Sequence, residues 1–181
     1  MRVGLAQFNP VVGDIAGNSR RIREMYATAD AAGCDIVVFP ELSITGYPPE
    51  DLVLKSGFVA ENQQSMRDIV AATQGCVAVF GFVDGSKGAL ANSAAIASNG
   101  TLHGTYNKQL LPNYSVFDED RYFTPGDSFS LFTIAGVHVG VGCTVGSQLH
   151  IHLLMVGFRR AFEQEVSGSF RRCGVSATLL E

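Results

Sequence analysis

One short segment constrains the fold more than any other feature of this sequence. Residues 36–39, Ile-Val-Val-Phe, are apolar at every position, which is typical of a central strand that is covered on both faces. Residues 2–8 alternate apolar side chains as a strand does, and residues 18–32 repeat them at three- and four-residue steps as an amphipathic helix does. The order strand, helix, strand predicts two parallel strands in an α/β domain.

The same kinds of pattern predict further elements along the chain. Asn18 or Ser19 is expected to cap the start of the first helix, and Gly33 is expected to end it. A second helix is expected near residues 60–73, followed by an apolar strand over residues 76–83. Two hairpins are expected, one with strands 91–98 and 101–108 and the other with strands 129–134 and 137–141.

The regular pattern ends near Cys143. Residues 144–181 contain no Asp, Asn, Lys, Pro or Tyr, and their local signals do not agree on one structure. We therefore divide the chain into a domain over residues 1–143 and an atypical tail over residues 144–181. The tail is either an ordinary C-terminal helix and coil or a segment that completes no native core.

Composition limits the expected partners and cellular setting. A formal net charge of −4 gives no electrostatic reason to expect nucleic acid or an anionic membrane as partner. The apolar runs are far shorter than the roughly 20 residues of a membrane helix, and the N-terminus has no signal-peptide pattern. The four cysteines are scattered, which predicts neither a disulfide framework nor a structural metal. We expect a cytoplasmic protein that holds no metal.

Three reactive side chains fall at the ends of predicted strands, where ligands usually bind in an open parallel sheet. They are Glu41, Lys108 and Cys143. Side chains alternate across a strand, so each shares a face with the apolar residues of its own parity. Those neighbours are Val37 and Phe39 for Glu41, Leu102 and Tyr106 for Lys108, and Val137, Val139 and Val141 for Cys143.

A carboxylate, an ammonium group and a thiol can together cleave an amide. Glu41 could take the thiol proton as general base, and Lys108 could stabilise the oxyanion that forms when Cys143 attacks a carbonyl carbon. Each residue also has a purely structural interpretation. Glu41 could cap a helix, Lys108 could be a solvated edge residue, and Cys143 could be a small core residue.

Two longer segments resemble the active-site blocks of one enzyme superfamily. Residues 39–52, FPELSITGYPPEDL, resemble the first block of the nitrilase (carbon–nitrogen hydrolase) superfamily, and residues 106–123 resemble the second. Among members of this superfamily, the residues of both segments are similar to those of the glutaminase domains of bacterial glutamine-dependent NAD⁺ synthetases. The resemblance covers about residues 2–141. It implies a nitrilase-like αββα sandwich, incomplete here after the third active-site strand because residues 144–181 match none of the later elements.

The resemblance also implies roles for individual residues. Glu41 matches the general base, Lys108 the oxyanion-stabilising lysine, Glu119 a second glutamate of the same pocket, and Tyr114 a substrate contact. We also expect Tyr47 of the first block to bind substrate. The implied reaction is hydrolysis of the side-chain amide of L-glutamine through a cysteine thioester.

The same resemblance implies how the products are used. Glutamate would leave, and the ammonia would pass to a synthetase domain or subunit that amidates nicotinic acid adenine dinucleotide. No cofactor is expected in this chain, because ATP would belong to that absent synthetase part. A homo-oligomer is also implied.

The third block departs from the family pattern at the cysteine. The family continues GVHVGV with Thr, an apolar residue and Cys-Glu-Asp, whereas Val141 is followed here by Gly142, Cys143 and Thr144. A slip of one residue turns a side chain to the opposite face, so Cys143 is expected to point away from Glu41 and Lys108 unless a bulge, for example at Gly142, restores its direction.

Two functions therefore remain open from the sequence. One is an amidase in which Cys143 is the nucleophile. The other is a catalytically inactive, truncated or reading-frame-shifted remnant, in which Glu41 and Lys108 form a structural ion pair and the chain is at most a binding or structural module.

Overall fold

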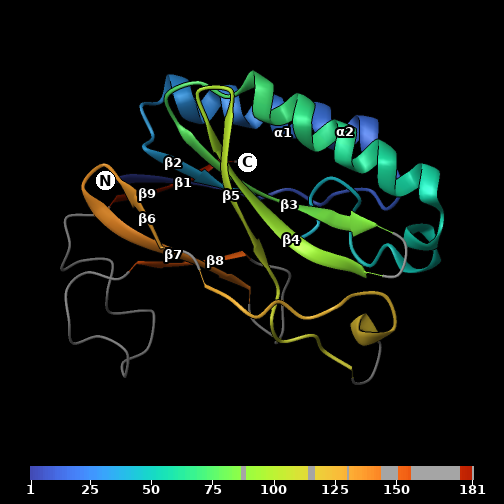
Figure 1. Cartoon of the computed structure of the whole chain (residues 1–181). Helices are drawn as coiled ribbons and strands as arrows, with labels where there is room; N and C mark the ends of the chain where they lie inside the picture. Colours follow the sequence, from blue (N-terminus) through green and yellow to red (C-terminus); the bar gives the residue numbers. More distant parts are fainter. Residues whose placement is uncertain (87–88, 114–116, 130, 144–150, 156–175, 181) are drawn as a thin grey trace.

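Two β-sheets and one layer of helices make up the part of the chain that the structure describes (Figure 1). The structure is a computed structural model, and it describes residues 1–86, 89–113, 117–129, 131–143, 151–155 and 176–180. The larger sheet has six strands in the order β5-β4-β3-β2-β1-β9, and the smaller has three in the order β6-β7-β8.

The first three strands of the larger sheet run parallel, which confirms the strand–helix–strand prediction. They are β1 (Arg2–Ala6), β2 (Ile36–Val38) and β3 (Val77–Ser86). The strand β9 (Ser176–Leu180) joins β1 in parallel at one edge. At the other edge β3 continues into an antiparallel ladder of β4 (Ala89–Ser98) and β5 (Thr101–Asn107).

Two helices cover one face of this sheet, as Figure 1 shows. They are α1 (Ile15–Ala31) and α2 (Ser56–Ala72). Their apolar sides form one core with the sheet residues that face them, which explains why β2 is apolar throughout. The core contains Ile22, Met25 and Ile69 from the helices and Val37, Phe39, Ala78, Phe80 and Phe82 from the sheet side.

The start of α1 differs from the prediction, whereas its end does not. The residue that caps the helix is Asp14, whose Oδ1 accepts a hydrogen bond from the Gly17 backbone nitrogen at 2.9 Å. Asn18 is buried inside the first turns, where its side-chain amide donates to the carbonyl oxygens of Val11 and Ile44. Asn18, which was predicted to cap the helix, instead makes a tertiary contact that the local sequence pattern does not reveal. Gly33, with φ +69°, follows the helix as predicted.

The smaller sheet packs against the other face of the larger one. Its strands are β6 (Leu131–Ile134), β7 (Val137–Cys143) and β8 (Ile151–Met155), all antiparallel. Ile134, Val139 and Val141 form a second core with residues of the larger sheet. These partners include Val3, Ile36, Val79, Ile96 and Tyr106. The described residues thus form helix, sheet and sheet layers, the α/β architecture expected of an incomplete αββα sandwich, and no helix among them covers the outer face of the smaller sheet.

The tail over residues 144–181 supplies an edge strand to each sheet. Its strand β8 pairs with β7, and its strand β9 pairs with β1. The backbone ladders of both sheets therefore extend beyond residue 143, while the division of the chain into domains at that residue stays a prediction.

Both predicted hairpins are present. Asn99 and Gly100 have φ +51° and +69°, and Ala135 and Gly136 have φ +47° and +76°, as two-residue hairpin turns require. The prediction that Leu102 and Tyr106 lie on the same face of their strand was wrong. A register shift in the β4–β5 ladder at Ile96 and Ala97 breaks the alternation of side chains between them. Leu102 is therefore 38% exposed, while Tyr106 is buried.

Two short 3-10 helices lie in the long loops between these elements. They are η1 (Glu50–Leu54), between β2 and α2, and η2 (Glu119–Arg121), between β5 and β6. The predicted second helix begins somewhat earlier than residue 60, at Ser56, and the predicted third strand extends past residue 83 to Ser86.

The turn after β2 approaches β3 very closely at Gly81. The Ser43 hydroxyl accepts a hydrogen bond from the Gly81 nitrogen at 3.1 Å and donates one to its carbonyl oxygen at 3.2 Å. A Cβ at Gly81 would overlap the backbone nitrogen of Leu42, a buried residue with φ +46°. Only glycine at this position allows the turn that carries residue 41 to lie on the sheet.

Replacing this glycine should therefore loosen the turn. We expect Gly81→Ala to lower the free energy of unfolding by about 1–3 kcal/mol or more, because the overlap is with backbone that must move. Gly57→Ala is the control, since no atom lies within 4 Å of its added Cβ and the site is in α2. That variant should be unchanged or stabilised by at most about 1 kcal/mol. Urea unfolding compares them, and equal effects would contradict the prediction.

Candidate active site

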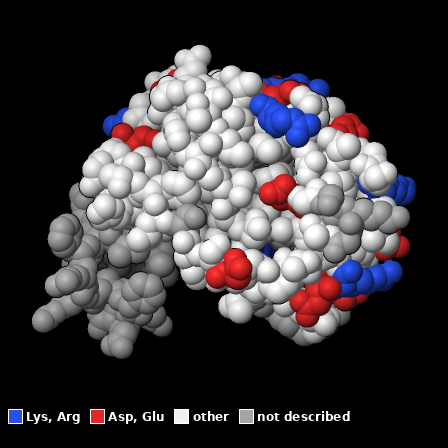
Figure 2. Space-filling view, viewed as in Figure 1, with Lys and Arg blue, Asp and Glu red and all other residues white. Residues whose placement is uncertain are grey.

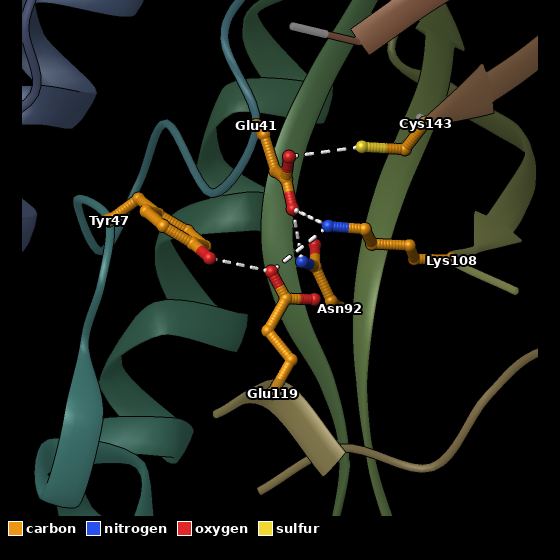
Figure 3. Close-up of polar contacts among 6 residues, drawn as sticks. All are labelled: Glu41, Tyr47, Asn92, Lys108, Glu119 and Cys143. Atoms are coloured by element: carbon orange, nitrogen blue, oxygen red, sulfur yellow. Dashed lines mark hydrogen bonds and ion pairs between the residues drawn. The ribbon is translucent and has the colours of Figure 1, made fainter. Parts of the chain in front are cut away.

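Four reactive side chains meet between the two sheets, as Figure 3 shows. Glu41 comes from the turn after β2, Lys108 directly follows β5, Glu119 opens η2 and Cys143 ends β7. The first three are 5%, 3% and 4% exposed. The fold therefore brings together all four residues that were predicted to be catalytic.

The Lys108 ammonium group lies between two carboxylates. Its Nζ is 2.7 Å from Glu41 Oε1 and 2.9 Å from Glu119 Oε1. The Lys108 backbone is held on both sides, because its nitrogen donates to the Asn92 carbonyl at 2.8 Å and its own carbonyl accepts from the Gly126 nitrogen at 2.9 Å. Buried charges persist only when they are paired, and this lysine pairs with both acids.

Two acids and one base leave the buried cluster one negative charge in excess. Burial raises the pKa of Glu119, and the nearby Glu41 carboxylate raises it further against the opposing effect of Lys108. Burial lowers the pKa of Lys108, but attraction to Glu41, Cys143 and Glu119 outweighs burial and leaves its pKa raised. The lysine thus stays charged, and Glu119 is the acid whose proton is held more tightly than usual.

The thiol of Cys143 points at the other oxygen of Glu41. Its Sγ is 3.0 Å from Glu41 Oε2, within hydrogen-bonding distance. Burial raises the pKa of Cys143, and the Glu41 carboxylate raises it further, whereas Lys108 opposes both. The thiol is therefore protonated at neutral pH, with a carboxylate oxygen next to it that can accept its proton.

This contact corrects the expectation that Cys143 points away from Glu41 and Lys108. The register of β7 is continuous through Gly142 and Cys143, so no bulge turns the side chain. Val139 and Val141 face the core between the sheets, and Cys143 shares their parity. The apolar side chains of β7, rather than the alignment to a motif, decide the face on which the cysteine lies.

Tyr47 lies beside the acids. Its hydroxyl donates to Glu119 Oε1 at 2.8 Å, and burial followed by that contact raises its pKa. A cleft of about 310 Å³ opens next to its ring. The lining residues are Gln7, Phe8, Asn9, Pro10, Pro40, Glu41 and Tyr47. Tyr114, the other predicted substrate contact, lies outside the described residues.

One residue of the site was missed by the sequence analysis. Asn92, on β4, is 3% exposed and its Nδ2 lies 2.5 Å from Glu41 Oε1. Its sequence signal is a polar side chain inside a strand whose other residues are mostly small and apolar. That signal does not predict which residue Asn92 contacts, because Glu41 is 51 residues away in the chain.

The fold and the site agree with one known family. The sequence model of the carbon–nitrogen hydrolases matches residues 2–149. The chain belongs to the carbon–nitrogen hydrolase family.

Similar proteins of this family include glutamine-dependent NAD⁺ synthetases. The chain is 46% identical over 144 residues to the one from Xanthomonas campestris pv. campestris, covering 78% of this chain and 26% of the relative. It is 43% identical over 143 residues to the one from Thermotoga maritima, covering 78% and 25%. The chain therefore spans about a quarter of the length of these curated relatives.

Two solved structures show a similar fold. The glutamine-dependent NAD⁺ synthetase from Acinetobacter baumannii, in complex with ADP, is 40% identical with a TM-score of 0.72, covering 76% of this chain and 26% of that chain. An amidase from Nesterenkonia sp. is 21% identical with a TM-score of 0.65, covering 76% and 53%, a likeness of fold alone. Within the described part of the chain, no helix is both long and apolar enough to cross a bilayer.

Removing the cation of this site should be costly. We expect Lys108→Met to lower the free energy of unfolding by about 3–5 kcal/mol, because it leaves two buried carboxylates unpaired. Arg21→Met is the control, since the Arg21–Glu24 pair on α1 is exposed and should contribute less than about 1 kcal/mol. Chemical denaturation measures both, and a similar small loss for the two variants would contradict the buried pairing.

The tightly held proton of Glu119 predicts a pH dependence of stability. A carboxyl whose pKa is raised by folding binds its proton where the unfolded chain has lost it, so folding stability falls as pH rises from about 4.3 through the raised value. Glu119→Gln removes this decline. The difference in unfolding free energy should move in favour of the variant from pH 4 to pH 7, and Glu24→Gln, at an exposed site, controls for the lost charge. A constant difference would refute the assignment.

Proposed function

We propose that this chain carries the glutaminase half-reaction of a glutamine-dependent NAD⁺ synthetase, with Cys143 as nucleophile. The observation that carries the proposal is the pair of contacts on Glu41: Cys143 Sγ at 3.0 Å from one oxygen and Lys108 Nζ at 2.7 Å from the other. Base, nucleophile and cation are thereby within reach of one amide group. The similarity to relatives of that name supports glutamine as the substrate.

The first half of the mechanism forms a thioester. Glu41 Oε2 takes the thiol proton while Cys143 Sγ attacks the side-chain amide carbon of L-glutamine. The oxygen of that amide becomes an oxyanion, which the Lys108 ammonium stabilises. The intermediate collapses, the C–N bond breaks, and Glu41 returns the proton to the departing ammonia.

The second half restores the enzyme. Glu41 takes a proton from water, the resulting hydroxide attacks the thioester carbon, and the C–S bond breaks. The proton held by Glu41 returns to the Cys143 sulfur, and glutamate leaves. Every proton moves through Glu41, so the general base and the nucleophile must stay in contact through both halves.

Glu119 and Tyr47 support this chemistry from the other side of Lys108. The Glu119 carboxylate fixes the ammonium group at 2.9 Å, and Tyr47 holds Glu119 in turn. Glu119 Oε2 is buried without a hydrogen-bond partner among the described residues, which leaves it open to an N–H of the substrate or of the departing ammonia. Tyr47 borders the cleft and is proposed to contact the substrate there, as is Tyr114.

The wider setting is part of the proposal. The ammonia would pass to a synthetase domain or subunit that uses ATP. The side chains of Glu41, Lys108 and Cys143 supply all the groups that the proposed half-reaction uses, so this half-reaction needs no cofactor. We further propose a cytoplasmic homo-oligomer with neither nucleic acid nor membrane as partner. On the face shown in Figure 2, acidic and basic side chains are scattered in small groups with no broad basic area, in keeping with that proposal.

The test is ammonia release from L-glutamine together with covalent labelling. Cys143→Ala should lower the rate by about 10⁴-fold or more, because the nucleophile is lost. A diazoketone analogue of glutamine should label Cys143, as mass spectrometry of the peptide would show. Cys34→Ala, which changes a buried thiol in the helix-side core, is the control and should keep both activities.

A folded chain that neither releases ammonia nor takes the label would refute the proposal. The alternative from the sequence, a remnant with a structural Glu41–Lys108 pair, predicts that result. Unchanged ammonia release by Cys143→Ala would refute Cys143 as nucleophile.

A further inference from the structure

The side chain of Asn92 lies in the centre of the site although it has no group that reacts. Figure 3 shows it on β4, beneath Glu41 and next to Lys108. It is 3% exposed, and its Nδ2 donates to Glu41 Oε1 at 2.5 Å. A buried amide at this distance from a carboxylate makes a strong, charge-assisted hydrogen bond.

Two donors converge on the same oxygen of Glu41. Lys108 Nζ is 2.7 Å and Asn92 Nδ2 is 2.5 Å from Oε1, whereas Oε2 is 3.0 Å from Cys143 Sγ. The terminal torsion of a glutamate is broad, so a carboxylate held by one donor alone can rotate. Two donors from different strand positions fix its plane and leave Oε2 directed at the sulfur.

Asn92 also aligns the second donor through its backbone. Its carbonyl oxygen accepts a hydrogen bond from the Lys108 nitrogen at 2.8 Å, which continues the β4–β5 pairing one step beyond the end of β5. Asparagine does this without adding a charge. The titratable groups that already act on Glu41 or lie beside it are Lys108, Glu119, Cys143 and Tyr47.

We propose that Asn92 is a positioning residue, which holds Glu41 so that Oε2, and not Oε1, receives the proton of the Cys143 thiol. The inference rests on the proposed function, because it assigns an orientation to the same base and nucleophile. It predicts that the amide donor keeps Oε2 of Glu41 aimed at the sulfur.

The test reads the base–thiol pair without glutamine. Iodoacetamide alkylates a thiol when the sulfur attacks its CH₂ carbon, the C–I bond breaks, iodide leaves and the thiol proton passes to Glu41. The rate at the Cys143 peptide is followed by mass spectrometry from pH 4 to pH 9. In the unchanged chain the rate should fall at acidic pH, because a protonated carboxyl group cannot accept the thiol proton.

Two variants remove the donor in different ways. Asn92→Ala removes the donor. A hydrogen bond to a carboxylate favours its charged form, so without this bond the acidic limb of the profile should move up by about one pH unit, a tenfold lower rate at a given pH on that limb. Asn92→Asp keeps the shape but places a second carboxyl against Oε1. Its limb should move further, and it carries the test if Asn92→Ala does not fold.

Asn62→Ala is the matched control. Asn62 is fully buried, and its side-chain amide donates to the Val83 carbonyl and accepts from the Val83 nitrogen. The variant therefore loses a comparable buried amide that does not contact Glu41. This variant should melt at lower temperature but keep the acidic limb in place. An acidic limb that is the same in the Asn92 variants and the unchanged chain would overturn the inference, as would an unchanged chain in which Cys143 is not alkylated at any pH.

The outcome is separable from that of the proposed function. A chain that hydrolyses no glutamine but shows the shifted limb refutes the glutaminase proposal and supports the role of Asn92. A chain that hydrolyses glutamine, and whose Asn92 variants show no shift of the acidic limb, supports the glutaminase proposal and refutes the role of Asn92.

Discussion

The rest of the site depends on one buried ion cluster, in which the Lys108 ammonium group lies between the carboxylates of Glu41 and Glu119. All three groups are buried, and the removal of charges from water is favourable only when close partners replace the solvent. The lysine satisfies this condition for both acids at once. It also occupies one oxygen of Glu41 and so leaves the other facing Cys143.

Backbone contacts fix the positions of the residues in this cluster, in addition to the contacts between their side chains. Ser43 and Gly81 bind the turn after β2 to β3, and the Asn92 carbonyl holds Lys108 at the end of β5. The cysteine arrives from the opposite sheet, where the apolar side of β7 packs into the second core. A site built from two packed sheets is rigid because neither sheet can move without disturbing that core.

The electrostatics favour a protonated thiol beside a base. Burial and the excess negative charge both raise the pKa of Cys143, so a preformed thiolate is disfavoured. Attack must then be coupled to proton transfer, which makes the distance between sulfur and Glu41 Oε2 the quantity that governs reactivity. This is why the orientation of one carboxylate, and the neutral donor that holds it, matters in this site.

Several features followed from the sequence by itself, because local pattern and parity are sufficient for them. The parallel pairing of β1 with β2, both hairpins and the inward face of β7 are set by apolar periodicity and by turn residues with positive φ. Glu41, Lys108 and Cys143 could be selected because each lies at or just after the end of a predicted strand. Glu119 could be selected only by resemblance, since no strand leads to it.

Tertiary structure decided what depends on partners far away in the chain. Asn18 became a tertiary contact instead of a helix cap because the Val11 and Ile44 carbonyls need its amide. A register shift in β4–β5 exposed Leu102 against its parity. The sulfur of Cys143 comes within 3.0 Å of Glu41 only because the two sheets pack together, and Asn92 joins the site only because β4 lies under the turn after β2. Such contacts have no local signal, since the energy that creates them comes from burial between elements.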